Sequence, residues 1–201
     1  MNTPDDRRTG ARQHISGVRP GVALMLVAVL TGGCSFNTWR TALLREDAPS
    51  ETALVTFVRP AVFMGDAVDA YVWDGSQFVG ALGAGTLLQY TTKPGAHLFV
   101  GNGKEPESWA FVRADLQAGK QYILKMKVYP GIFSAQVGFT VVPKTDTRVS
   151  AWIQNLKPVT TNPEKMMSYS TEKQNAVDNA IYDFKTGKLT TYITLSPDEG
   201  R

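Results

Sequence analysis

The residue types that most often carry chemistry are scarce in this sequence. The chain has one cysteine, Cys34, and two histidines, His14 and His97. A nucleophilic mechanism needs a nucleophile, a base and an orienting acid within reach of one another, and the surroundings of His97 supply no such set. His97 follows the Pro94-Gly95 turn, where we expect its ring to satisfy nearby backbone groups. The sequence therefore predicts a protein that is not an enzyme.

Metal and cofactor sites are not expected either. Structural zinc takes cysteine and histidine ligands, and after residue 33 the chain offers only one of each. Asp66, Asp69 and Asp74 are clustered, but their spacing does not fit a calcium loop. The glycines of segment 80–85 precede a strand pattern, whereas a phosphate loop precedes a helix. We predict no metal and no cofactor.

Aromatic side chains are the better candidates for binding. Tyr71 and Trp73 share one face of an alternating segment, Trp109 is expected nearby, and exposed rings of this kind contact sugars and proteins. Two interpretations remain. Either this face is a binding surface, or it is the second face of a sandwich and a C-terminal helix covers it. We favour the second interpretation. Phe63, in the 60–67 loop, is a further candidate contact.

Length and composition indicate a single globular domain with appendages. The chain has 201 residues, of which 43% are hydrophobic and 19% charged, and it can bury a core without disulfides. The net charge is +3, but four arginines and two aspartates in the first 33 residues account for +2 of it. A body near +1 gives no electrostatic case for nucleic acid, which would need a basic patch or stripe, so no nucleic-acid partner is expected.

The elements that must position these residues are mostly strands. Turn signals such as Asp74-Gly75 separate segments of alternating hydrophobicity, because glycine tolerates the positive φ of tight turns. This spacing, without intervening helices, is typical of a sandwich or barrel. We therefore predict a mainly β domain over residues 53–143, a sandwich of about eight strands. The predicted strands are 54–58, 68–73, 77–82, 86–91, 96–100, 109–115, 121–128 and 133–142.

The segments on either side have helical spacing. In the tether, residues 34–52, an amphipathic helix is expected over Phe36–Leu44, and its stripe, including Trp39, either packs on the domain or rests in lipid headgroups. Residues 144–201 form a C-terminal helical extension. Its predicted elements are helices over 149–156 and about 171–184 and a last strand over 189–195.

The chain begins with the features of an export leader. An apolar run of ten residues, 21–30, follows the four arginines. It is shorter than the roughly 20 residues of a membrane span and matches the 7–15 or so of a signal peptide. The run ends in Thr31-Gly32-Gly33-Cys34, which predicts a signal peptide over residues 1–33.

Leu30 to Cys34 resembles the lipobox of bacterial lipoproteins, although the leucine that usually lies three residues before the cysteine is replaced by Thr31. The resemblance implies cleavage before Cys34 and diacylglycerol on its thiol, and several acyl chains hold a protein firmly to a membrane. Ser35, rather than aspartate, follows the cysteine. In such lipoproteins this implies the outer membrane, with the protein on its periplasmic face.

The middle of the chain carries turn motifs that resemble those of proteobacterial lipoproteins sharing a domain of unknown function and, more loosely, PEGA-type β modules. The resemblance covers residues 53–142 and implies an immunoglobulin-like or prealbumin-like sandwich, without catalytic residues. We expect a membrane-anchored module that binds or scaffolds an envelope protein. The alternative is a carbohydrate or peptidoglycan-binding module using Tyr71 and Trp73. The motifs are Trp73-Asp74-Gly75, Val79-Gly80, Lys93-Pro94-Gly95-Ala96-His97 and Ala118-Gly119-Lys120-Gln121-Tyr122.

Overall fold

The computed structural model describes residues 39–62, 68–103, 108–130 and 135–201. The described residues all belong to one compact unit, Phe36–Arg201. The predicted leader, Cys34, Phe36 and Phe63 lie outside the described residues. Within them the mainly β prediction is confirmed, because two mixed sheets pack face to face as a sandwich with a C-terminal helix.

The first sheet has six strands in the order β1-β10-β5-β2-β8-β9, and the second has five in the order β11-β7-β6-β3-β4. The first contains β1 (Trp39–Thr41), β10 (Lys157–Thr161), β5 (Thr86–Thr92), β2 (Ala53–Arg59), β8 (Gln121–Pro130) and β9 (Ala135–Val141). The second contains β11 (Tyr192–Leu195), β7 (Trp109–Leu116), β6 (Gly95–Asn102), β3 (Ala70–Asp74) and β4 (Gln77–Leu82). All eight predicted strands are present, with ends that differ by at most two residues.

The main core lies between the two sheets. Phe57 from β2 and Phe99 from β6 are fully buried there, and their rings meet edge to face with centroids 5.4 Å apart. Phe139 from β9 packs on the same cluster. Successive side chains of a strand point to opposite faces, so each strand sends alternate residues into this layer.

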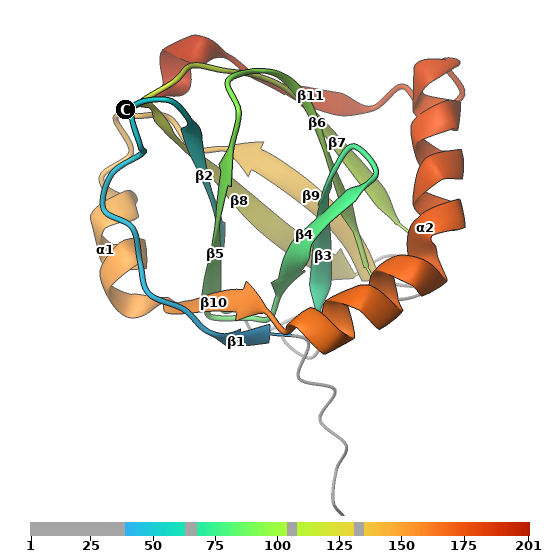
Figure 1. The fold of residues 1–201 in the computed structure, drawn as a ribbon, viewed down its shortest axis with the longest axis horizontal. Helices are drawn as coiled ribbons and strands as arrows, with labels where there is room; N and C mark the ends of the chain where they lie inside the picture. Colours follow the sequence, from blue (N-terminus) through green and yellow to red (C-terminus); the bar gives the residue numbers. More distant parts are fainter. Residues whose placement is uncertain (1–38, 63–67, 104–107, 131–134) are drawn as a thin grey trace, which may run out of the picture. The chain divides into compact units, whose positions relative to one another are not determined.

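Two helices cover the outer faces of the sandwich, on opposite sides of it (Figure 1). α1 (Arg148–Asn155) places Val149 on Val58 and Ile123 of the first sheet. α2 (Pro163–Lys185) lies across the second sheet. The helices therefore bury apolar side chains that point away from the main core.

The helix predicted over Phe36–Leu44 is wrong in the part of the tether that is described. Trp39–Thr41 forms β1, which pairs antiparallel with β10. Without β1, β10 would be an edge strand with unpaired backbone groups on one side. Pairing satisfies these groups, and this tertiary gain outweighs the local helical spacing.

The C-terminal extension is not separate from the sandwich. Its two helices are confirmed, but α2 begins at Pro163, because Asn162 caps it by accepting a hydrogen bond from the Glu164 amide at 3.1 Å. The predicted last strand is confirmed as β11. The extension also supplies β10, which was not predicted, so the boundary expected at residue 143 does not separate two structural units.

Two glycines allow close packing around the core. A Cβ on Gly101 would lie 2.6 Å from the Phe139 ring, and one on Gly80 would lie 2.5 Å from the Thr161 hydroxyl. That hydroxyl donates to the Val79 carbonyl at 3.2 Å. Gly80 thus lets β4 of the second sheet approach β10 of the first and close one side of the sandwich.

Candidate functional site

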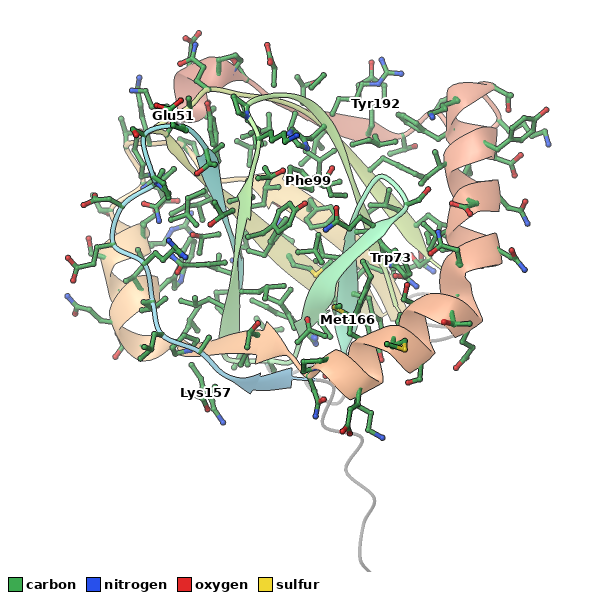
Figure 2. All side chains as sticks on the ribbon, in the orientation of Figure 1. Glu51, Trp73, Phe99, Lys157, Met166 and Tyr192 are labelled. Carbon is green, nitrogen blue, oxygen red and sulfur yellow. The ribbon has the colours of Figure 1, made fainter. Side chains whose placement is uncertain are left out.

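Tyr71 and Trp73 are buried beneath α2 and do not form an exposed surface. Their exposed fractions are 4% and 0%. The Tyr169 ring of α2 stacks on Tyr71 with centroids 4.0 Å apart, and the Trp73 indole donates to Asn102 Oδ1 at 3.1 Å. Trp73 lies between the second sheet and α2 (Figure 2). The interpretation of these residues as a binding surface is therefore wrong, and the covered-face interpretation is confirmed.

Burial also changes the ionisation of this face. Burial, and then the negative charges of Asp69 and Glu172, raise the pKa of Tyr71 to about 12. Trp109 is half-buried and packs on the same cluster. The structure thus brings Tyr71, Trp73 and Trp109 together as a packing layer.

His97 lies in a hydrogen-bonded group that joins the sheets. Its Nδ1 lies 2.8 Å from Asp74 Oδ2, its Nε2 lies 2.8 Å from the Lys93 carbonyl oxygen, and Tyr90 donates to Asp74 Oδ2 at 3.1 Å. We call these four groups the His97 clasp. Burial, as the largest cause, raises the pKa of Tyr90. Since Tyr90 is on β5 and Asp74 on β3, the clasp connects the first sheet to the second.

The geometry of the clasp favours a structural role. A general base needs a ring nitrogen that can reach substrate, but both nitrogens of His97 already contact protein oxygens. Both of these oxygens are acceptors, so a doubly protonated ring would donate to each. The contact with the Lys93 carbonyl confirms that His97 satisfies a backbone group beside the Pro94-Gly95 turn.

Other sites for small ligands are limited in the described part of the chain. It contains no group of three or more His, Cys, Asp or Glu side chains placed to hold a metal ion. No helix among the same residues is long and apolar enough to cross a membrane. Of the clustered aspartates, Asp66 lies outside the described residues and Asp74 belongs to the His97 clasp.

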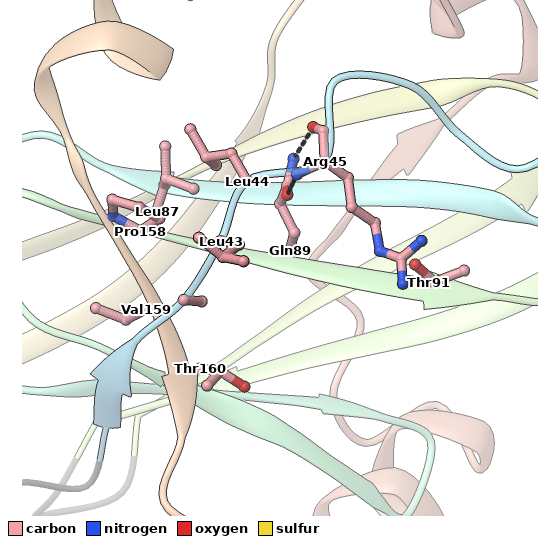
Figure 3. Close-up of a pocket in the computed structure, with 10 residues that line it drawn as sticks. Leu43, Leu44, Arg45, Leu87, Gln89, Thr91, Pro158, Val159 and Thr160 are labelled. Carbon is pink, nitrogen blue, oxygen red and sulfur yellow. Dashed lines mark hydrogen bonds between the residues drawn. The ribbon is translucent and has the colours of Figure 1, made fainter.

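A cavity of about 150 Å³ lies where segment 42–45 crosses the first sheet (Figure 3). The Gln89 side chain holds this segment from both sides, accepting from the Arg45 amide at 2.7 Å and donating to the Arg45 carbonyl at 2.9 Å. The rest of the lining is mixed, with Leu44, Leu87 and Val159 as apolar members and Arg45, Thr91 and Thr160 as polar ones. Because its amide is already used, Gln89 fastens the tether to the sheet and offers little to a ligand.

One part of the first sheet's outer face projects charged and aromatic side chains. Lys125, Lys127 and Tyr129 alternate along β8, and Arg148 and Trp152 of α1 border them. We call these five residues the cationic face. Lys127 is exposed, the exposed fraction of Tyr129 is 48%, and the Tyr129 ring lies against Gly138, where a Cβ would approach it to 3.4 Å. The absence of a side chain at Gly138 therefore lets the Tyr129 ring pack directly on the β9 backbone.

Positive charge is concentrated on the cationic face. Lys125 and Arg148 both lie over the Trp152 ring, at 5.4 Å and 5.2 Å from its centroid. Burial, and then the charges of Arg148 and Lys127, lower the pKa of Lys125. Arg148 pairs with Asp146 at 2.6 Å, whereas Lys125 and Lys127 form no ion pair with any described residue. An arriving anion would relieve this repulsion.

No sequence motif singles out the cationic face. Its signal was present in Lys125-Met126-Lys127-Val128-Tyr129, where polar and apolar residues alternate with period two. Alternation alone shows that the polar set lies on one face, but not that α1 stops short of covering it. No family model and no curated protein matches the chain.

Proposed function

We propose that this chain is a lipid-anchored, non-enzymatic protein-binding module of the bacterial cell envelope. Its leader, residues 1–33, would be removed, and Cys34 would carry the lipid that holds it on the periplasmic face of the outer membrane. The sandwich would bind an envelope protein through the cationic face. The observation that carries the proposal is this uncovered, positively charged and aromatic surface beside α1.

The composition of the cationic face suits protein binding. Tyrosine, tryptophan and arginine are enriched at the energetic centres of protein interfaces, and Tyr129, Trp152 and Arg148 lie here. Lys125 and Lys127 are two residues apart on one strand, which separates them by about 7 Å along the strand. An extended segment with acidic side chains at alternate positions has the same spacing. We therefore propose an acidic, extended segment as the partner's contribution.

The position of β1 limits how far the sandwich would lie from a lipid on Cys34. Trp39, the first residue of β1, follows Cys34 by five residues. Five fully extended residues span at most about 18 Å, so a lipid on Cys34 would hold the sandwich close to the membrane. The carbohydrate-binding alternative depended on exposed Tyr71 and Trp73 and loses that basis with their burial.

The partner can be tested in cells that make the full-length protein. A photo-crosslinking amino acid at position 129 should capture one envelope protein, and the same amino acid at exposed position 182 on α2 serves as the control. The adduct should disappear with Lys127→Glu, and an acidic extended segment should carry the crosslinked residue. Identical adducts from both positions, adducts only with lipid or glycan, or indifference to Lys127→Glu would each contradict the proposal.

The anchor is tested separately by mass spectrometry of the mature N-terminus. We expect it to begin at an acylated Cys34 in protein from membranes, and Cys34→Ala to abolish acylation, with Ser35→Ala as the matched control. An unmodified Cys34 in membrane-fraction protein would refute the lipid anchor while leaving the cationic face to be judged by crosslinking.

A further inference from the structure

Exposed aliphatic side chains gather at one end of the sandwich. Among the described residues the exposed large aliphatic side chains are Leu43 (96% exposed), Val62 (51%), Met166 (39%) and Met167 (72%). The other large exposed hydrophobic residues in the described part of the chain are Tyr129, Tyr182 and Tyr192. A soluble surface normally scatters such residues singly, whereas a group of them marks a contact with a protein or a membrane.

Backbone hydrogen bonds place these four residues around β1 and β10. The Ala42 amide, next to Leu43, donates to the Pro158 carbonyl at 3.0 Å. Two hydrogen bonds connect the start of β10 to the end of β2, which lies just before Val62. The Lys157 amide donates to the Gly85 carbonyl at 2.9 Å, and the Gly85 amide donates to the Arg59 carbonyl at 2.8 Å. All of these bonds lie at one end of the strands.

The two methionines complete this end. α2 starts two residues after β10, and the Met166 amide donates to the Asn162 carbonyl at 2.8 Å. Thr161 of β10 is the register partner of Trp39, so the first turn of α2 lies beside the start of β1. β1, β10 and the beginning of α2 run along the lower edge of Figure 1, and Lys157 and Met166 lie at that edge in Figure 2.

This is also the end from which the chain leads back to Cys34. Because the five residues from Cys34 to Trp39 reach at most about 18 Å, a lipid on Cys34 would bring the bilayer to this end. Methionine and leucine side chains can enter the headgroup region of a membrane. The tether length and the exposed aliphatic residues are independent observations that point to the same end.

We propose that Leu43, Val62, Met166 and Met167 form a seat that rests on the headgroup region of the membrane holding the anchor. The inference depends on the lipid anchor of the proposed function and adds an orientation to it. The end with the His97 clasp then faces away from the membrane. The sandwich is held at two places, by lipid and by side chains, and does not tumble freely on its tether.

The orientation can be measured on the mature lipoprotein in vesicles of phosphatidylcholine and phosphatidylglycerol. Since acylation blocks the thiol of Cys34, a cysteine introduced by Met167→Cys can be labelled alone with an environment-sensitive dye. Ala118→Cys, in the exposed turn between β7 and β8, is the control at the opposite end. Nitroxide lipid headgroups should quench the dye at position 167 several-fold more strongly than the dye at position 118.

Flotation tests the anchor, and quenching in protein that floats tests the seat. Protein that floats with the vesicles but shows equal quenching at both positions retains the anchor and refutes the seat. A dye at position 167 that is shielded from water yet not quenched by lipid would show that a protein, such as a second copy, covers this end, which also refutes it. Failure to float overturns the anchor and the seat together. Replacing Met166 and Met167 by serine should lower quenching at a label on Val62→Cys, whereas Tyr182→Ser should not.

Discussion

Trp73 gives the most direct test of how the sandwich is built. Its side chain is fully buried between the second sheet and α2, and its indole donates to Asn102 Oδ1 at 3.1 Å. Trp73→Ala removes a large buried side chain, which costs about 3–5 kcal/mol, and leaves the buried Asn102 oxygen without this donor, which costs about 1–3 kcal/mol more. A domain with a typical stability of about 5–15 kcal/mol would be close to unfolding.

Trp73→Phe separates these contributions. It keeps an aromatic ring beside Phe78 and Tyr169 but removes the indole N–H, so we expect a loss of about 1–3 kcal/mol. Tyr129→Ala, which removes a ring exposed by 48%, should change stability by less than about 0.5 kcal/mol.

Urea unfolding followed by circular dichroism would measure the three variants against the parent. The urea concentration at the midpoint should be highest for Tyr129→Ala, lower for Trp73→Phe and lowest for Trp73→Ala, with unchanged m-values. If Trp73→Ala unfolds with the midpoint of Tyr129→Ala, Trp73 is not sealed beneath α2 and the covered-face conclusion fails. A loss of binding in Trp73→Ala alone would not restore a binding role, because the unfolded fraction would explain it.

Other substitutions address the close packing, the helix cap, the clasp and the buried phenol. Gly101→Ala should lose about 1–3 kcal/mol, because the new Cβ meets the buried Phe139 ring at 2.6 Å; no change in the urea midpoint would contradict the packing. Asn162→Ala should lose about 1 kcal/mol by removing the cap of α2, and amide hydrogen exchange should show faster exchange in its first turn. His97→Phe keeps a ring against Phe99, on which the His97 ring stacks with centroids 5.8 Å apart, but removes both polar contacts of the imidazole, so we expect a loss of about 1–3 kcal/mol in urea; an unchanged midpoint would show that the contacts of His97 carry no stability. The pKa of Tyr71 is raised from 10.0 to about 12 in the folded protein. The stability that the protonated phenol contributes is therefore fully present below pH 10 and is lost as the pH rises toward 12 and beyond. Tyr71→Phe should remove this pH dependence of the free energy of unfolding, and the ultraviolet absorbance of tyrosinate should follow the ionisation.

The strands were predictable because their signals are local. Alternating residues in segments such as 77–82 and 109–115 place one apolar face on a core, and turns such as Asp74-Gly75 end them. The contact of His97 with the Lys93 carbonyl could be anticipated for the same reason, since His97 follows a turn whose backbone needs partners. The helix at Arg148–Asn155 was recognisable from the spacing of Val149, Trp152 and Ile153.

Binding surfaces were harder to predict, because exposure depends on what lies above a face. β3 is apolar on both sides, and its sequence could not show whether Tyr71 and Trp73 meet solvent or α2. On β8, the alternation of Lys125, Lys127 and Tyr129 was visible, but only the position of α1 leaves that face open.

The sequence by itself determined the eight central strands, the two helices and the leader pattern that ends at Cys34, because turns, alternation and helical spacing act over a few neighbouring residues. Tertiary structure alone decided that Trp39–Thr41 and Lys157–Thr161 become strands, and that four exposed aliphatic residues lie at the same end of the sandwich. The physical reason is the same in both cases: backbone pairing and burial are supplied by segments more than a hundred residues apart, and no local window of the chain contains them.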